Sequence, residues 1–347
     1  HGVQKIKEGY NPATWMLEVS SIAQETALGV DFAQTYKNSE LYRRSKALIK
    51  ELSVPAPGSS DLYFPTQYSQ PSFAQFTACL WKQRCSYWRN TMYTALRLLF
   101  AAFVGVLFGS VFWKVGKQRD SQQQLFNAMG SMYTAVLFLG IQNASGVQPI
   151  VFVERTVFYR ERAAGMYSAL PYAFAQVLIE LPYCFFQTLF YGVTVYAMMG
   201  FAWTVAKFFW FLFFMYFTLL YFTYYGMMCV GLTPNASVSA IISAAFYGVW
   251  NLFSGFLIPR PRIPVWWRWY YWATPIAWSL YGMLVSQFGD YEDRLDGTEV
   301  QVKQFLHDYF GFKHSFLGVV AGVILGINVL FAVVFAYSIK TFNFQRR

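Results

Sequence analysis

Charged residues are scarce in this sequence. Asp, Glu, Lys and Arg make up 13% of the 347 residues, whereas a soluble globular domain carries about 25%. Aromatic residues reach 21%, and the mean hydropathy is +0.31. A soluble core of this length could not hide so much apolar surface. The composition therefore excludes an ordinary soluble domain and indicates a protein that lipid covers in part.

Metal-binding side chains are also few. None of the three histidines lies in a long apolar run, which argues against the histidine clusters of membrane di-iron oxygenases. No two of the four cysteines have the C-x-x-C spacing of a zinc site, so we interpret them as inert thiols. We therefore predict no metal site. The residues concerned are His1, His307 and His314, and Cys79, Cys85, Cys184 and Cys229.

Motifs of hydrolytic enzymes are missing from the sequence. It contains no G-x-x-x-x-G-K-S/T phosphate-binding loop, no G-x-S-x-G and no H-E-x-x-H. Without a loop that cradles phosphates, this chain is not expected to hydrolyse ATP, and we predict neither a catalytic residue nor a bound cofactor. The net charge of +10 comes from basic residues at the edges of apolar segments. That pattern fits anionic lipid headgroups better than nucleic acid.

Long apolar runs are what the chain does have. A transmembrane helix needs about 20 mostly apolar residues, and six runs satisfy this requirement. An even number places both termini on one side, which we take as the cytosolic side. The predicted fold class is an all-α polytopic membrane protein. Its six spans are 94–113, 125–147, 171–199, 208–232, 238–258 and 316–337.

A further apolar run covers 264–288, but Arg268 and Pro275 interrupt it. Five of the twelve tryptophans fall within it, and Trp prefers the headgroup level of a bilayer. We therefore predict a short re-entrant helical hairpin between the fifth and sixth spans. It would belong to an external region at 259–315.

The segments around the membrane domain are polar. Residues 1–68 are predicted to be a cytosolic segment with a helix at 31–51, followed by a Pro/Gly/Ser linker. An amphipathic connecting helix is predicted within 69–93, along the cytosolic headgroup surface. The membrane domain would cover 94–340, with a cytosolic tail at 341–347. Because the sequence opens with His1, not Met, we expect a fragment of a longer polypeptide.

Two groups of residues could carry function. Glu180 is the one acidic residue within a predicted span, so it is either the proton site of an ion-coupled carrier or a hydrogen-bonded carboxylate near a helix end. Uncharged polar residues of the second and fifth spans, such as Gln142, Asn143 and Asn251, are either interhelical glue or walls of a cargo passage.

A dense mixed-charge stretch, ERTVFYRER at 154–162, separates the second and third spans. Arginines beside the Phe158–Tyr159 pair could dock into a groove of another protein. A solvated helix held by i, i+4 ion pairs explains the same pattern equally well.

Four long motifs make the chain resemble a known family. They are GYNPATWMLEV at 9–19, FYRERAAGMYSALP at 158–171, YFTYYGMM at 221–228 and WNLFSGFLIPRPRIP at 250–264. Together they resemble the second, C-terminal membrane domain of plant pleiotropic drug resistance transporters, which are full-size ABC transporters of the G subfamily. The resemblance covers essentially the whole chain.

The resemblance implies partners that this chain does not contain. The family alternates nucleotide-binding and membrane domains, so the chain would follow a second nucleotide-binding domain, and ATP and Mg would bind elsewhere in the same polypeptide. The stretch at 154–162 would couple the membrane domain to that nucleotide-binding domain. The implied coupling residues are Glu154, Arg155, Phe158, Tyr159, Arg160, Glu161 and Arg162.

The resemblance also implies a cargo path. An upper gate is expected at Phe256 and Leu257. The family exports small hydrophobic or amphipathic molecules such as hormones, terpenoids, lipid or phenolic precursors and xenobiotics, and the plasma membrane is the expected location. A non-transporting membrane scaffold or partner subunit is the other reading. The helix around Tyr247–Asn251 is similar to the family's central fifth helix, which lines the cargo path. Together with the polar and aromatic residues of the second span, the candidate pathway residues are Phe138, Gln142, Asn143, Tyr247, Trp250 and Asn251.

Overall fold

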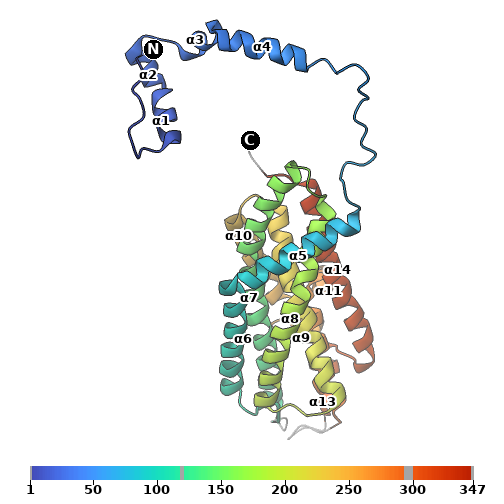
Figure 1. Cartoon of the computed structure of the whole chain (residues 1–347). Coiled ribbons are helices and arrows are strands. Elements are labelled where there is room, and N and C mark those ends of the chain that lie inside the picture. Colours follow the sequence, from blue (N-terminus) through green and yellow to red (C-terminus); the bar gives the residue numbers. More distant parts are fainter. Residues whose placement is uncertain (1, 118–120, 293–299, 345–347) are drawn as a thin grey trace. The chain divides into compact units, whose positions relative to one another are not determined.

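Helices form every regular element in the computed structural model, which describes residues 2–117, 121–292 and 300–344. The chain divides into two units, residues 1–65 and residues 66–347. The second unit is a helical bundle (Figure 1). This architecture confirms the prediction of an all-helical protein.

The first unit holds four short helices, each begun by a polar side chain. The caps are Asn11, Ser21, Asp31 and Ser39, whose side-chain oxygens accept a backbone N–H of the first turn. Ser39 splits the helix predicted at 31–51 into two. The helices are α1 (Pro12–Val19), α2 (Ile22–Leu28), α3 (Phe32–Asn38) and α4 (Glu40–Leu52).

The second unit begins with a helix that leads directly into the first membrane-length helix. Helix α5 (Ser72–Arg89) ends at Asn90, whose side chain accepts the Tyr93 backbone N–H at 3.2 Å and so starts α6 (Thr91–Val111). Phe73, Trp81 and Trp88 of α5 are exposed.

The next helix is longer than its predicted span. Helix α7 (Gln122–Ala163) has 42 residues and is about 60 Å long, twice the hydrocarbon thickness of a bilayer. The sequence predicted a span at 125–147 and treated the charged stretch at 154–162 as a separate segment. The structure joins them in one uninterrupted helix.

Helices α8 (Ala169–Met199) and α9 (Val205–Leu232) follow the predicted third and fourth spans closely. Helix α10 (Ala236–Leu252) does not reach the predicted limit at 258. Past Leu252 the chain turns at Gly255, whose φ of +90° suits a residue without a Cβ.

The region between α10 and the last helix is folded into short elements. Two 3-10 turns, η2 (Arg260–Arg262) and η3 (Val265–Trp267), precede α11 (Arg268–Ala273) and α12 (Pro275–Phe288). All 14 residues of α12 are buried, and the helix packs between α9 and α14. The remaining elements are α13 (Val302–Phe305), the π-helical turn η4 (Leu306–Phe310), the 3-10 turn η5 (His314–Phe316) and α14 (Leu317–Thr341).

Among the described residues, five helices are long and apolar enough to cross a membrane. They are α6, α7, α8, α9 and the segment His314–Thr341, which includes α14. Helix α10 is apolar but has only 17 residues. The structure therefore supports a multi-span membrane domain, while the count of six spans stays a prediction.

Helix α9 is the centre of the bundle, because α7, α8, α10, α12 and α14 all pack against it. Two glycines allow the closest approach, between α7 and α9. A Cβ at Gly226 would lie 2.4 Å from the backbone oxygen of Ala144, and a Cβ at Gly140 would lie 2.3 Å from the Phe222 ring. These helices can pack at this distance only where a side chain is missing.

Replacing Gly226 with Ala should therefore force α7 and α9 apart. We expect Gly226→Ala to lower stability by about 1–3 kcal/mol, measured as a lower thermal midpoint of the purified full-length polypeptide. Gly146→Ala is the matched control, since a Cβ there meets nothing within 4 Å and alanine favours helix. Equal midpoints for the two variants would contradict the close approach.

Candidate functional site

A buried ion pair stands in the bundle beside α5. Glu180 of α8 is completely buried, and one of its oxygens accepts from Arg97 Nη1 of α6 at 2.7 Å. The Tyr87 hydroxyl of α5 donates to the other oxygen, also at 2.7 Å. Side chains from two helices, α5 and α6, thus compensate one carboxylate of α8 in an apolar surrounding, where an unpaired charge would be very costly.

The ion pair continues into a hydrogen-bond network that reaches α7. Arg97 Nε donates to Gln187 Oε1 at 2.8 Å. The amides of Gln187 and Asn143 bond each other reciprocally at 2.8 and 3.0 Å. Glu180, Cys184 and Gln187 stand at helical spacing i, i+4, i+7, which puts them on one face of α8. The network therefore connects α5, α6, α7 and α8.

The charged end of α7 is tied to α5. Lys82 Nζ lies 2.5 Å from Glu161, and the Ser86 hydroxyl donates to Glu154 at 2.6 Å. The Tyr167 hydroxyl also donates to Glu161. Burial, followed by that hydrogen bond, raises the pKa of Tyr167. Both glutamates of the mixed-charge stretch thus hold α5 against α7.

Arg155 closes the end of α9. Its guanidinium is buried and donates to the backbone oxygens of Val230, Thr233 at 2.7 Å and Pro234 at 3.0 Å. The last carbonyls of a helix have no partner within it and attract positive charge, so Arg155 acts as a cap.

The other members of the mixed-charge stretch divide into packed and exposed residues. The Phe158 ring stacks on Tyr172 at 4.5 Å, and Tyr159 is buried beside it. Arg160 and Arg162 are exposed. Of the seven predicted coupling residues, these two arginines are the ones that present charge to the outside.

The predicted pathway residues on α7 lie on two sides of the helix. Phe138 is 43% exposed and lies against the rings of Phe100 and Phe108. Gln142 lines a cavity of about 480 Å³ between α6 and α7. Asn143 also borders this cavity but is buried in the polar network.

The predicted pathway residues on α10 point inward. Tyr247 and Trp250 are buried, and both pack against Tyr225 of α9, with ring centroids 5.7 and 4.6 Å away. Trp250 also stacks on Phe331 of α14 at 6.3 Å. The outer face of α10 carries exposed apolar side chains, among them Ile241, Val249 and Leu252.

The predicted gate is connected to α7 through Tyr133. Its ring stacks on Phe256 at 5.3 Å, and its hydroxyl donates to Asn251. The ring of Phe256 approaches α7 at Gly130, where a Cβ would lie 3.0 Å from it. Leu257 is 56% exposed and stands outside this cluster.

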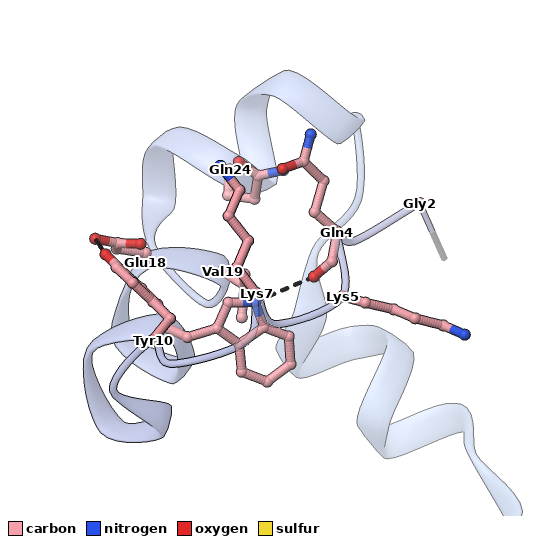
Figure 2. A pocket seen from close by; sticks show the side chains of 9 residues that line it. Gly2, Gln4, Lys5, Lys7, Tyr10, Glu18, Val19 and Gln24 are labelled. Atoms are coloured by element: carbon pink, nitrogen blue, oxygen red, sulfur yellow. Dashed lines mark hydrogen bonds between the residues drawn. The ribbon is translucent and has the colours of Figure 1, made fainter.

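The first unit has a polar pocket of about 460 Å³ (Figure 2). The Trp15 indole donates to the Gln4 backbone oxygen at 3.1 Å, and the Tyr10 hydroxyl donates to Glu18 at 2.7 Å. The latter bond raises the pKa of Tyr10. Within the part of the chain that the structure describes, no group of three or more His, Cys, Asp or Glu could hold a metal ion.

Comparison with known proteins decides the class of this bundle. The family description "ABC-2 type transporter" matches residues 74–288, more than half of the chain. The chain belongs to the ABC-2 type transporter family. It is 66% identical to Pleiotropic drug resistance protein 1 of Nicotiana tabacum over 346 residues. It is 65% identical to ABC transporter G family member 36 of Oryza sativa subsp. indica over 347 residues. It is 63% identical to ABC transporter G family member 40 of Arabidopsis thaliana over 346 residues.

Each of these matches covers 100% of this chain and 24% of the relative. The chain therefore spans about a quarter of the curated relatives it matches. The resemblance to plant pleiotropic drug resistance transporters is confirmed. The family match identifies an ABC-2 membrane domain within residues 74–288, while the boundaries predicted for the membrane domain, 94–340, stay a prediction.

In this ABC-2 domain, sequence reasoning missed the partners of the predicted residues. It considered Glu180, in the third predicted span, alone, although Arg97 stands in the first predicted span and was a visible signal. Tyr87, Gln187 and Tyr133 gave no signal, because tyrosine and glutamine are not distinctive in a membrane protein so rich in both. Their roles depend on how each helix is rotated and shifted against its neighbours, which the sequence does not reveal.

Removing one partner of the ion pair should cost more than removing both. We expect Arg97→Met to destabilise the full-length polypeptide by about 3–5 kcal/mol, because Glu180 would remain buried without its cation. The double variant Arg97→Met with Glu180→Met should regain much of the loss. Thermal midpoints in one detergent would measure the cycle. Simple addition of the two single effects would contradict the pairing.

Proposed function

We propose that this chain is the C-terminal transmembrane half of an ATP-driven exporter of small hydrophobic or amphipathic molecules. The observation that carries the proposal is the continuity of α7. One helix bears exposed arginines near its end, at Arg160 and Arg162, and the gate partner Tyr133 near its start. These positions are about 40 Å apart along the helix, so a push on one end can move the other.

The proposed topology has six spans and both termini in the cytosol. Helix α10 would be the fifth span, shortened by the turn at Gly255, and α11 with α12 would form the re-entrant part of the external region at 259–315. Residues 1–68 would be the cytosolic segment after a nucleotide-binding domain. The connecting helix would lie within 69–93, the membrane domain at 94–340 and the cytosolic tail at 341–347.

The exposed aromatic residues of α5 support its placement at the headgroup level. Phe73, Trp81 and Trp88 are exposed, and Arg84 and Arg89 lie on the same helix. Aromatic rings with basic residues are typical of helices that lie on a bilayer surface. We propose the plasma membrane as that bilayer, by analogy with the family.

The proposed partners are the nucleotide-binding domains and the other membrane domain of one polypeptide. Arg160 and Arg162 would contact a nucleotide-binding domain, which binds ATP and Mg. The ties of Lys82 to Glu161 and of Ser86 to Glu154 would make α5 and α7 move as one body. Closure driven by ATP would then shift the membrane halves between inward-open and outward-open states.

The proposed cargo path runs along the faces of α7 and α10 toward the gate. Phe138 and Gln142 would contact cargo directly, since both are exposed. Asn143, Tyr247 and Trp250 would shape the wall from behind, because they are buried. Phe256 stacks on Tyr133, whose hydroxyl donates to Asn251, and would form the gate with Leu257.

Two rivals predict different behaviour. An ion-coupled carrier would need Glu180 to exchange protons, yet Arg97 and Tyr87 already satisfy this carboxylate. A non-transporting scaffold or partner subunit would show no flux. A requirement for ATP distinguishes the exporter from the carrier, and transport by the reconstituted polypeptide distinguishes it from the scaffold.

Reversing the charge at the end of α7 should uncouple transport. We expect Arg160→Glu with Arg162→Glu to reduce ATP-dependent efflux roughly tenfold, because a docking surface would meet the wrong charge. Glu154→Ala should act in the same direction by releasing α5 from α7. Efflux from vesicles that contain equal amounts of inserted protein would measure the effect. Lys340→Glu, another exposed residue, is the control, and unchanged efflux in the arginine variant would refute the coupling role.

Changing the gate support should alter which cargo passes. We expect Asn251→Ala and Tyr133→Phe to change the relative export rates of chemically different compounds, because each removes the hydrogen bond that fixes the Tyr133 ring against Phe256. A panel of apolar and amphipathic compounds would be assayed in parallel. Asn127→Ala, at the start of α7, serves as the control. If the profile keeps the same proportions in both gate variants, Asn251 is interhelical glue only.

A further inference from the structure

A groove of about 770 Å³ lies between α8 and α9, away from the polar network and the gate. Small-molecule sites usually have volumes of about 300–1,000 Å³. Helices α8 and α9 are in close contact at two points beside the groove. A Cβ at Gly192 would lie 2.7 Å from Leu212, and the Tyr216 hydroxyl donates to the Leu181 backbone oxygen at 3.3 Å. The groove is lined by Leu181, Pro182, Phe185, Phe186, Thr188, Leu189, Phe209, Leu212, Phe213, Tyr216 and Phe217.

One polar side chain in this lining lacks a partner. Thr188 is 3% exposed, and its hydroxyl has no hydrogen-bond partner among the residues that the structure describes. Other threonines on these helices bond the carbonyl four residues earlier. Thr194 bonds Phe190 at 2.8 Å, and Thr223 bonds Leu219 at 2.9 Å. A buried hydroxyl without a partner is costly, so a hydrogen-bonding group brought by a ligand would be favoured here.

We propose that this groove binds a sterol of the surrounding bilayer, with Thr188 as the partner of the sterol hydroxyl. Three features select a sterol. The walls are apolar and largely aromatic, which suits a flat and rigid ring system. The unpartnered Thr188 hydroxyl can form a hydrogen bond with a single polar atom of the ligand. From Leu181 to Leu189 the groove wall is about 12 Å long, the scale of a fused ring system.

The outward setting of the groove indicates a bilayer source. Phe185, Phe186 and Phe209 on its rim are each more than half exposed, and both helices are candidate membrane spans. Lipid therefore has direct access to the groove. This site does not depend on the export proposal, because it requires only that α8 and α9 stand in a membrane.

The test uses the full-length polypeptide in lipid nanodiscs, with a photoreactive diazirine sterol as the probe. Unlabelled sterol should compete with labelling. Thr188→Val should weaken sterol binding about tenfold without lowering the thermal midpoint, because the hydroxyl has no protein partner to lose. Thr194→Val, on the same helix but bonded to Phe190, should leave binding unchanged.

A chemical cycle and a steric variant complete the test. A sterol hydrocarbon without oxygen should bind the wild-type protein about tenfold more weakly than sterol does. The Thr188→Val variant should bind the hydrocarbon and the sterol with equal affinity. Leu189→Trp should abolish labelling by filling the groove, whereas Val193→Trp, equally exposed and outside the lining, should not. Undiminished labelling in Leu189→Trp would overturn the site. Equal competition by phosphatidylcholine would also overturn it, since the groove would then hold acyl chains.

Discussion

The bundle depends on compensating one carboxylate where water is absent. Glu180 is buried at the junction of α5, α6 and α8, where a lone charge would be strongly destabilising. Arg97 supplies the counter-charge, while Tyr87 satisfies the second oxygen. Since these partners come from different helices, the ion pair sets the register of the amphipathic helix against the membrane spans.

The same helices carry the features that the export proposal needs. Helix α7 contributes Asn143 to the polar network, and its Glu154 and Glu161 bond side chains of α5. Its Tyr133 stacks on the gate residue Phe256. Several of its polar side chains thus have partners on other helices, and Gln148 adds a bond to the Ser243 hydroxyl of α10 at 2.6 Å. A bundle joined in this way moves in large pieces, because breaking any one tie would leave a buried polar group without a partner.

Thr188 is one of nine described residues with a buried side-chain polar atom that has no partner, and it is the one among them that lines the groove between α8 and α9. The charged groups of Glu180 and Arg97 are bonded within the protein, whereas Thr188 lines a groove between two candidate membrane spans. The contrast separates two kinds of polar residue in a membrane protein. One kind holds helices together, and the other is available to molecules that arrive from the bilayer.

The sequence by itself determined the solvent, the class of secondary structure and the family. Apolar runs of membrane length allow only helices here, because every backbone group in lipid must be bonded within its own segment. Long motifs such as the one at 158–171 identified the family. Local sequence also located α5, α6, α8, α9 and α14 within a few residues. It ended the α7 span at 147, joined α3 to α4 across Ser39 and extended α10 past Gly255.

Only the tertiary structure decided which side chains meet. Arg97 and Glu180 are 83 residues apart, and hydropathy says nothing about the rotation of one span against the next. The sequence left Tyr247 and Trp250 as either pathway or packing residues, and the structure packs both rings against Tyr225 of α9. The physical reason is the same in each case. A pattern along one helix states that a face is polar or apolar, whereas its partner is chosen by packing between helices.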